Sequence, residues 1–321
     1  MVNFYDRLTK KIKQAKEARK KAIDILRGIS IRMPLMIYGA DVPIDEDIDI
    51  DDFVKIVDDE SWKEFMPTGV TKDLFKEFTK YYDRDIFIAA GKRIRRLAAA
   101  ADKETPTRRV IQIAEIFRHF KNPDKETVLT PWRVVNMHMA ETIGGWCFFN
   151  EKFEDDTNEE KHRLDEPRFV DNGITQELFG EHAHILEINS KTGLYPLYLT
   201  YSFYKQRIEG MSDDDWEPEE CQHFWKEALN DNVYVICKTP MAKSITKRTL
   251  CGYNKTIVIN AHCFDDLVNM LKNKSEQFKR KIFQGNYWKK DEKIMKFDAV
   301  VGNPDRVHII GVNLKNWATP Q

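Results

Sequence analysis

A repeated alternation of short apolar runs with helix-like segments, between residues 185 and 301, constrains the fold most strongly. Four runs of four or five residues, rich in Val, Ile and other apolar residues, have the length and composition of buried strands. They are residues 185–188, 233–237, 256–259 and 297–301. Strands that alternate with helical segments form parallel sheets with right-handed crossovers. The sequence therefore predicts an α/β fold built on a parallel sheet.

The turn that follows the first predicted strand, residues 187–193, is the strongest candidate for a ligand site. It is polar and closes on Gly193, and a glycine lets the backbone bend sharply and approach a ligand with no Cβ in the way. In doubly wound sheets, nucleotides bind outside the carboxyl ends of the strands. We therefore expect this turn to hold a nucleotide-like cofactor.

Two common nucleotide-binding motifs are absent from this part of the chain. Ser190-Lys191-Thr192 superficially resembles a phosphate-binding loop, but that loop requires a glycine in place of Ser190 and a further glycine upstream. The dinucleotide fingerprint G-x-G-x-x-G is absent as well. An ATP or NAD site is therefore not expected here.

Upstream of the predicted sheet, Thr130-Pro131 has the chemistry of a helix start. Thr130 is a good N-cap, and Pro131 suits the first helical position because its missing N–H is not needed there. We expect the helix to run to the Gly144-Gly145 pair. Taken alone, the segment is best explained as an ordinary helix that packs its apolar face against the core.

Thr130-Pro131, the turn at 187–193 and the segment 297–304 occur in an order that resembles the adenine-specific DNA methyltransferases of restriction–modification systems. The closest likeness is to large, type IIG-like single-chain proteins that fuse methylase, nuclease and sometimes helicase parts. In that family a Thr-Pro helix start covers the methionine end of S-adenosylmethionine, and a turn reading Asp-Pro-x-Cys-Gly-x-Gly binds the cofactor. An Asn-Pro-Pro-Tyr or Asn-Pro-Pro-Phe loop grips the target adenine. The resemblance implies a Rossmann-like (class I methyltransferase) partial parallel sheet.

Carried over by position, the resemblance assigns cofactor binding to five residues and catalysis to two. The cofactor residues are Thr130, Pro131, Glu187, Asn189 and Gly193. The catalytic pair is Asn303 and Pro304, whose side-chain amide oxygen and carbonyl oxygen would accept hydrogen bonds from the amino group of an adenine flipped out of the duplex. Methyl transfer needs the sulfonium held in line with the nucleophilic nitrogen, so positioning carries most of the catalysis. No metal ligand is implied.

The sequence departs from the family pattern in three places. The cofactor turn has Glu-Ile-Asn where Asp-Pro is usual and only one glycine, and Cys237 stands near the place of an acidic residue that binds ribose hydroxyls. Asp305-Arg306 replaces the Pro and aromatic residue that follow the Asn-Pro pair. We therefore expect a chain truncated just after the Asn-Pro-Pro-Tyr position, inactive alone, with the remaining half of the methyltransferase as a possible partner.

The first 121 residues are predicted to be mainly helical. Residues 4–26 form an amphipathic helical pattern with a stop at Gly28, residues 29–38 look like a strand, and residues 58–120 contain several helical patterns. Two basic clusters are candidates for DNA contacts: the Lys-rich face of the first helix, and a group on a later helix. That group is Lys92, Arg93, Arg95 and Arg96. A solvated helix face is the preferred explanation of both clusters.

Composition bounds the class of protein. The formal net charge is −1, so any binding to nucleic acid must rest on local patches. No apolar run approaches the roughly 20 residues of a membrane span, and the N-terminus lacks the apolar centre of a secretory signal. The five scattered cysteines indicate reduced thiols. We expect a cytoplasmic protein whose partner is double-stranded DNA and not a membrane.

Three smaller clusters have ordinary explanations. His182 and His184 could share a metal ion, but no third ligand is in view. Four aromatic residues could stack on bases, although core packing suits them better. These are Trp132, Trp146, Phe148 and Phe149. The run Asp213-Asp214-Asp215 is predicted to be a solvated turn.

These features predict three parts: a mainly helical region (1–121), a cofactor-binding portion of a methyltransferase (122–304) and an atypical tail (305–321). The leading hypothesis is an N-terminal fragment of an S-adenosylmethionine-dependent adenine-N6 DNA methyltransferase from a restriction–modification system. The alternative is a non-catalytic module that contacts DNA or links a helicase or nuclease part to a methylase. A third option is an unrelated α/β binding protein. Whether this chain is itself an enzyme stays open.

Overall fold

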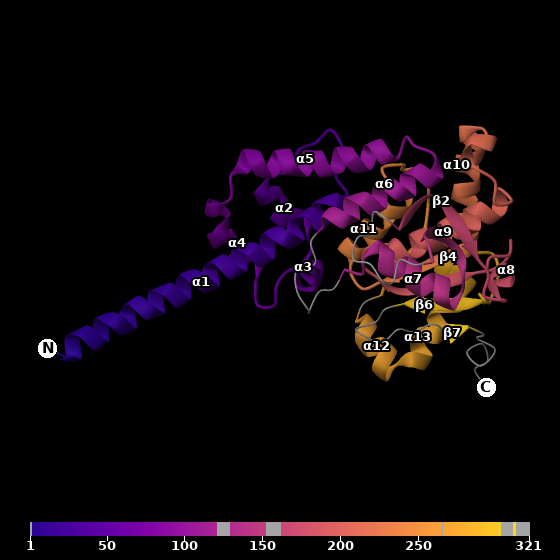
Figure 1. Ribbon diagram of the computed structural model, residues 1–321. Helices are drawn as coiled ribbons and strands as arrows, with labels where there is room; N and C mark the ends of the chain where they lie inside the picture. Colours follow the sequence, from indigo (N-terminus) through magenta and orange to yellow (C-terminus); the bar gives the residue numbers. More distant parts are fainter. Residues whose placement is uncertain (1, 121–128, 152–161, 265, 303–310, 313–321) are drawn as a thin grey trace.

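The computed structural model describes residues 2–120, 129–151, 162–264, 266–302 and 311–312, without the side chains of residues 2–9, 11–12 and 311–312. Figure 1 shows a long first helix that leads from a projecting N-terminal arm into a body where helices surround a sheet. The N-terminal helices are α1 (Val2–Gly39), α2 (Ile50–Ile56), α3 (Asp59–Phe65), α4 (Lys72–Phe78), α5 (Arg84–Ala101) and α6 (Pro106–His119). The later helices are α7 (Trp132–Thr142), α8 (Thr175–Leu178), α9 (Leu194–Arg207), α10 (Pro218–Glu227), α11 (Pro240–Cys251), α12 (Leu267–Asn273) and α13 (Ser275–Ile282).

The described strands form a small hairpin and one main sheet. The hairpin pairs β1 (Gly145–Phe149) with β2 (Arg163–Val170) in antiparallel fashion. The main sheet consists of β3 (Ile185–Ser190), β4 (Val233–Cys237), β5 (Asn260–Cys263), β6 (Ala299–Gly302) and β7 (Gly311–Val312).

The order of the main sheet is β5-β4-β3-β6-β7. The pairs β3–β4, β4–β5 and β3–β6 are parallel, and β7 adds an antiparallel edge to β6. The predicted parallel α/β sheet is therefore confirmed. The chain leaves β3 toward β4 and β5 on one side and returns to β6 on the other side, so the strand order reverses at β3. Open sheets of this kind bind ligands beside such a reversal point, at the carboxyl ends of the strands.

Alternating residues of the strands supply two separate apolar cores. Ile185, Val235 and Val301 face the larger core, which α1, α6, α7, α9 and α11 share. Leu186 and Ile236 face a smaller core closed by α13 and by aromatic side chains near Trp288. Figure 1 shows the same layering, with α12 and α13 on the side of the sheet opposite α9 and α11. The strands β3, β4 and β6 are thus buried on both faces, as parallel strands usually are.

The helical N-terminal region is confirmed, but its first elements differ from the prediction. Residues 29–38, predicted as a strand, continue α1 to Gly39, and Gly28 does not end the helix. A Cβ at Gly28 would lie 3.1 Å from the Pro67 Cγ, so this glycine permits a close contact within the helix. The apolar run at 29–38 is buried around a helix here, because tertiary packing overrides local strand propensity.

The helical region and the sheet are joined by direct contacts. At Gly39, α1 approaches α11 so closely that a Cβ would lie 2.3 Å from the Ile245 Cγ1. The carboxylate of Asp102, at the end of α5, accepts a hydrogen bond from the Tyr253 backbone N–H at 2.7 Å and pairs with Arg109 at 3.1 Å. One continuous apolar core therefore spans both regions.

Three further sequence predictions can be compared with the structure. The aromatic group is core material as preferred: Trp132, Phe148 and Phe149 are buried, and Trp146 packs half-buried against them. The predicted strand at 256–259 is wrong, since β5 begins at Asn260, where it pairs with Tyr234 of β4. No helix in the described ranges is long and apolar enough to cross a membrane.

The prediction of a solvated turn at residues 213–215 is wrong for its first residue. Asp213 is 6% exposed, and its carboxylate accepts hydrogen bonds from three donors. These are the Thr107 backbone N–H at 2.8 Å, the Thr107 hydroxyl at 2.9 Å and the Tyr204 hydroxyl at 2.9 Å. Thr107 lies in the first turn of α6, so Asp213 satisfies a free N–H at a helix N-terminus.

Candidate functional site

The candidate site lies at the carboxyl ends of β3 and β6, beside the point where the strand order reverses. Ile188 of β3 is the in-register partner of Gly302, the last residue of β6. The turn at 187–193 and the end of β6 at Gly302 therefore lie at the same edge of the sheet. Asn303 and Pro304, the predicted catalytic pair, come next in the chain but lie outside the described residues. Of the second predicted segment, the structure thus places the part up to Gly302 at this edge.

The turn itself depends on two residues in the left-handed region of backbone conformation. Asn189 has φ 69° and Gly193 has φ 75°, and α9 begins directly after Gly193. The sharp bend predicted at Gly193 is confirmed. A Cβ at Gly193 would lie 2.9 Å from the Thr246 Cα and 3.1 Å from the Thr249 Cβ. The space that this glycine leaves is therefore filled by α11, so its role is to let a helix approach and not to clear room for a ligand.

Glu187 is the most unusual ionisable group at this edge. Its side chain is 4% exposed on the face of β3 that points toward α9 and α11, and its Oε2 atom is buried without a hydrogen-bond partner. Burial raises the pKa of Glu187 to about 8, although a hydrogen bond with Ser190 acts in the opposite direction. The half-buried Asn189 also has a buried side-chain oxygen, Oδ1, without a partner. Buried acceptors normally find donors, so these two oxygens of one turn are available to accept hydrogen bonds from a ligand with N–H or O–H groups.

The helix α7 contributes a third side of this region. Its N-cap is Pro131, in extended conformation with ψ 152°, so the helix starts one residue later than predicted and Thr130 is not the cap. Further along α7, His138 Nδ1 lies 2.8 Å from the Tyr195 hydroxyl in the first turn of α9. Burial raises the pKa of Tyr195, and the negative charge of Glu187 raises it further. His138, Tyr195 and Glu187 thus link α7 to the turn.

A carboxylate that the sequence analysis missed lies at the end of β4. Glu64 of α3 accepts a hydrogen bond at 2.5 Å from the Thr239 hydroxyl, two residues past Cys237. Burial is the main reason that the pKa of Cys237 is raised, and the charges of Glu187 and Glu64 add to it. The sequence has Cys237 where the resembled family places an acidic residue, and α3 brings an acidic side chain into the same neighbourhood. No local motif could have revealed it, because Glu64 lies far away in the sequence.

The basic cluster predicted to contact DNA is divided by the fold. Arg95 is 1% exposed and donates hydrogen bonds to the backbone carbonyls of Val42, Pro43 and Glu46. Its assignment to DNA binding is therefore wrong: Arg95 closes the loop that follows α1. Lys92 forms a surface ion pair with Asp47 at 2.8 Å. Arg93 and Arg96 are exposed on α5, and their contact with DNA stays a prediction.

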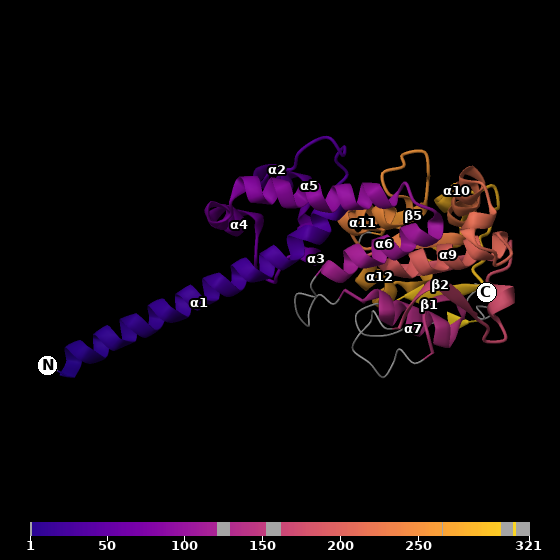
Figure 2. The ribbon, with the colours of Figure 1, turned by 45° about the horizontal axis from the view of Figure 1, so that its top comes forward.

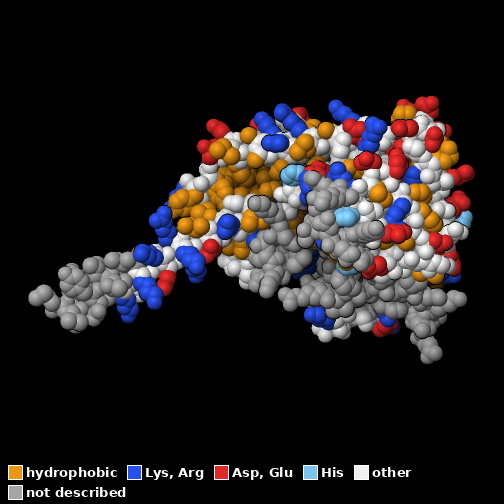
Figure 3. Space-filling model, viewed as in Figure 1, with side chains coloured by type: hydrophobic (Ala, Val, Ile, Leu, Met, Phe, Trp, Pro, Cys, Tyr) orange, Lys and Arg blue, Asp and Glu red, His pale blue; other side chains and the backbone are white. Residues whose placement is uncertain are grey.

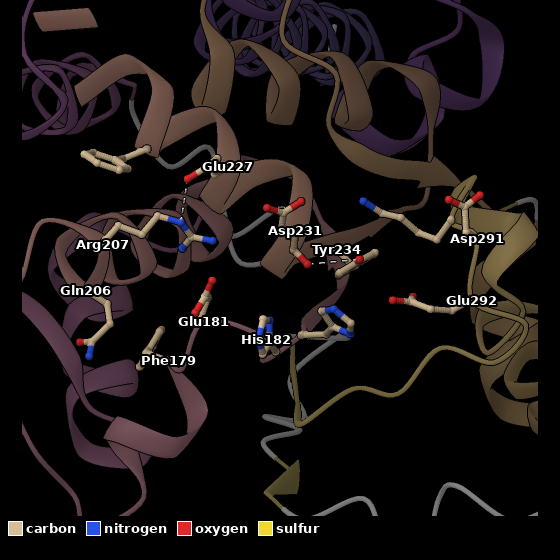
Figure 4. Close-up of a pocket in the computed structure, with 13 residues that line it drawn as sticks. Phe179, Glu181, His182, Gln206, Arg207, Glu227, Asp231, Tyr234, Asp291 and Glu292 are labelled. Carbon is tan, nitrogen blue, oxygen red and sulfur yellow. Dashed lines mark hydrogen bonds and ion pairs between the residues drawn. The ribbon is translucent and has the colours of Figure 1, made fainter. Parts of the chain in front are cut away.

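A large pocket of about 810 Å³ opens at the opposite, amino end of the strands. Figure 4 shows Arg207 and Glu227 on one side of it, Asp231 and Tyr234 at the start of β4, and Asp291 and Glu292 on the other side. His182 and His184 line the same pocket. Within the described ranges, no three His, Cys, Asp or Glu side chains are grouped to hold a metal ion. This pocket is separated from the turn at 187–193 by the length of β3.

Comparison with known families gives an independent result for part of the chain. Residues 231–305 match the model of the family described as Eco57I restriction-modification methylase. This match supports a methylase of a restriction–modification system. It covers β4, α11, β5 and β6, whereas β3 and α7 lie outside it. No curated protein and no solved structure matched the chain.

The residues at the carboxyl edge fit the chemistry of S-adenosylmethionine. That molecule carries an ammonium group and two ribose hydroxyls, which are donors, and a sulfonium cation. Glu187 Oε2 and Asn189 Oδ1 are unmatched acceptors, and a cation beside Glu187 would favour its ionised form. Glu64 adds a second carboxylate near the end of β4. The donor–acceptor balance of the site is therefore suited to this cofactor.

Proposed function

We propose that this chain carries the cofactor-binding part of an S-adenosylmethionine-dependent adenine-N6 DNA methyltransferase of a restriction–modification system. The proposal rests above all on the buried, unmatched carboxylate oxygen of Glu187 at the point where the strand order reverses. The family match over residues 231–305 supports the methylase class. Together they favour an enzyme site over the other hypotheses.

The residues of this chain would have the following roles. Glu187 and Asn189 accept hydrogen bonds from the cofactor, and α7, which begins after Thr130-Pro131, covers it from the side of His138 and Tyr195. When bound, S-adenosylmethionine supplies an electrophilic methyl group. Asn303 and Pro304 would hold the amino group of a flipped-out adenine, since the chain reaches them directly after Gly302. Gly193 fixes the bend from which α9 begins.

Titration calorimetry with S-adenosylmethionine and S-adenosylhomocysteine tests the cofactor. The wild-type chain is expected to bind both, and Glu187→Gln is expected to weaken binding of the ammonium-bearing ligands about tenfold or more, since about 1.4 kcal/mol corresponds to a factor of ten. Glu181→Gln is the matched control, because Glu181 is exposed at the amino end of β3. No heat with wild-type protein at millimolar ligand, or equal binding by both variants, would contradict the assignment.

The target base needs a separate measurement. Duplex DNA incubated with methyl-labelled S-adenosylmethionine and then digested to nucleosides should carry any transferred label in N6-methyladenine, and Asn303→Ala should abolish that transfer. Label in methylcytosine would show a methyltransferase of another specificity. Cofactor binding without methyl transfer would support the cofactor assignment and contradict a catalytic role for this chain alone.

A non-catalytic module that contacts DNA is the second candidate function. Arg93 and Arg96 on α5 are exposed and carry no ion pair in the described part of the chain, which favours a contact with phosphates. Retention of duplex DNA by a chain that gives no heat with either cofactor would support this alternative. Its salt dependence would measure the number of phosphates contacted.

A further inference from the structure

The first half of α1 projects from the body as a single helix. Figures 1 and 2 show it leaving the molecule in both views, with no other element beside its N-terminal part. Lys10 and residues 13–21 are all exposed, and among the described side chains of α1 the first buried one is that of Ile29. Isolated helices are marginal in water, and most helical stability in proteins comes from packing of one face. A projecting helix of this length is therefore suited to a partner.

The charge of this arm is strongly positive. Between Lys10 and Arg27 the sequence carries eight Lys and Arg residues against two acidic residues, Glu17 and Asp24. Figure 3 shows Lys and Arg side chains along the arm between its grey tip and the body. In the part of α1 whose side chains are described, none of these cations is engaged in an ion pair. The arm thus contrasts with a whole chain whose formal net charge is −1.

Four of the cations form a straight stripe. At about 100° per residue, Lys13, Lys16, Lys20 and Arg27 lie within about 60° of one another on the helix surface and span about 21 Å. The opposite face carries Ala22 and leads to the buried Ile29. The basic stripe therefore faces away from Ile29, and its Lys20 lines a groove beside Pro67.

Two other partners fit this arm poorly. A coiled coil with a second copy would place the charged Arg19 in the middle of its seam, between Ile12 and Ala15 on one side and Ala22 and Leu26 on the other. It would also bring two positive helices together. A membrane surface is usually bound through aromatic residues on the apolar face, and the segment from Lys10 to Gly28 carries Ile12, Ile23, Ile25, Leu26 and alanines but no aromatic residue.

We propose that the projecting half of α1 binds the phosphate backbone of duplex DNA through Lys13, Lys16, Lys20 and Arg27. The stripe has the regular spacing and length to neutralise several phosphates along one strand. It acts without regard to base sequence, because phosphate contacts position a protein and carry no sequence information. The choice of DNA as the polyanion rests on the proposed function. The charge and the exposure of the arm are observed independently of that function.

Fluorescence anisotropy with a labelled 30-base-pair duplex, measured over a series of NaCl concentrations, tests this contact. The triple variant Lys13→Gln/Lys16→Gln/Lys20→Gln should bind about tenfold or more weakly at low salt. The slope of log K against log [NaCl] should fall by about 2 to 3, because each lost phosphate contact removes about 0.9. Gln keeps nearly the helix propensity of Lys, so far-UV circular dichroism should be unchanged.

The matched control removes the same charge elsewhere. Lys55, Lys63 and Lys76 are exposed on α2, α3 and α4, and each already pairs with an acidic residue three positions earlier. Their replacement by Gln should leave the salt slope unchanged, and Glu17→Gln with Asp24→Asn should strengthen binding. Equal DNA affinity of the α1 triple variant and wild type would overturn the proposal. Equally tight capture by phosphatidylserine vesicles or poly-glutamate would overturn the choice of DNA, and cofactor calorimetry on the same variants reports separately on the methylase.

Discussion

Gly302 and Ile188 face each other where β6 ends beside β3. They are in-register partners in the parallel sheet, and a Cβ built on Gly302 would lie 2.7 Å from the carbonyl oxygen of Ile188. Real Cβ atoms essentially never approach that closely. The glycine therefore sets how near the end of β6 comes to the turn that holds Glu187.

Gly302→Ala should push β6 away from β3 and destabilise the protein. We expect a loss of about 1–3 kcal/mol, as for other overpacked sites, measured by urea denaturation. Gly91→Ala is the matched control: Gly91 lies inside α5, where the new methyl group would meet the Ile37 Cγ2 at an ordinary 3.4 Å. Because Ala is the better helix former, the control should be neutral or gain about 0.5–1 kcal/mol. If Gly91→Ala lost as much free energy of unfolding as Gly302→Ala, the close contact at Gly302 would not be the cause of the loss.

The raised pKa of Glu187, about 8, predicts a pH-dependent stability. Below the ordinary pKa near 4.5, both folded and unfolded states hold the proton. Between these two values the unfolded chain ionises while the folded one stays protonated, so the free energy of unfolding falls as pH rises from about 5 to about 8. Glu187→Gln removes this titration. The stability of wild type relative to the variant should therefore decline between pH 5.5 and 8.5.

Saturating S-adenosylmethionine should reverse part of this trend, because a bound cation favours the ionised carboxylate. The corresponding measurement is calorimetry at pH 7 in buffers of different ionisation enthalpy, which should report proton release on binding. A difference between wild type and Glu187→Gln that stays constant across the pH range would show that Glu187 titrates normally.

Asp213→Ala should destabilise the junction of α6 with α9. The substitution leaves three buried donors of Thr107 and Tyr204 without their acceptor, and we expect a loss of roughly 2–4 kcal/mol from unmatched buried groups. The neighbouring Asp214 is exposed, so Asp214→Ala should change stability by about 0.5 kcal/mol or less. Thermal unfolding of the two variants side by side distinguishes a structural carboxylate from a solvated one.

Arg95→Ala should act on stability and not on DNA affinity. Its guanidinium satisfies three backbone carbonyls of the loop at 42–46, and loss of hydrogen bonds from a charged donor costs about 1.5–3 kcal/mol. Arg96→Ala, an exposed residue of the same helix, should leave stability nearly unchanged. If Arg95→Ala kept full stability and lost DNA binding selectively, the burial of Arg95 would be the wrong explanation of its role.

The sequence predicted the sheet well, because strand length, apolar content and intervening helices are local signals. The starts of β3 and β4 agree with prediction, while β5 lies a few residues later because pairing with Tyr234 to Cys237 decides the register. Residues 29–38 were misassigned since an apolar run suits a buried helix as well as a strand. In α5, the 3–4 spacing of Gly91, Arg95 and Ala98 already indicated that Arg95 shares the buried face.

The site was predicted in part. The turn at Glu187 and its position beside β6 followed from the motif order, but the packing of Gly193 against α11 did not, since it depends on a helix that begins many residues later. Glu64, Asp213 and the contact of His138 with Tyr195 join residues remote in the sequence. Single-sequence patterns carry no signal for such pairs.

The continuous core between α1 and α11 determines how the chain can be shortened. Removal of residues before Ala22 would take away the arm, whose described side chains are exposed. Removal of everything before residue 122 would strip α11 of Gly39, Tyr38 and Arg109, the neighbours that shield it. Proteolysis in solution should accordingly trim the arm first and spare the rest as one cooperative unit. The helical segment and the sheet would then unfold together, because they share one apolar core.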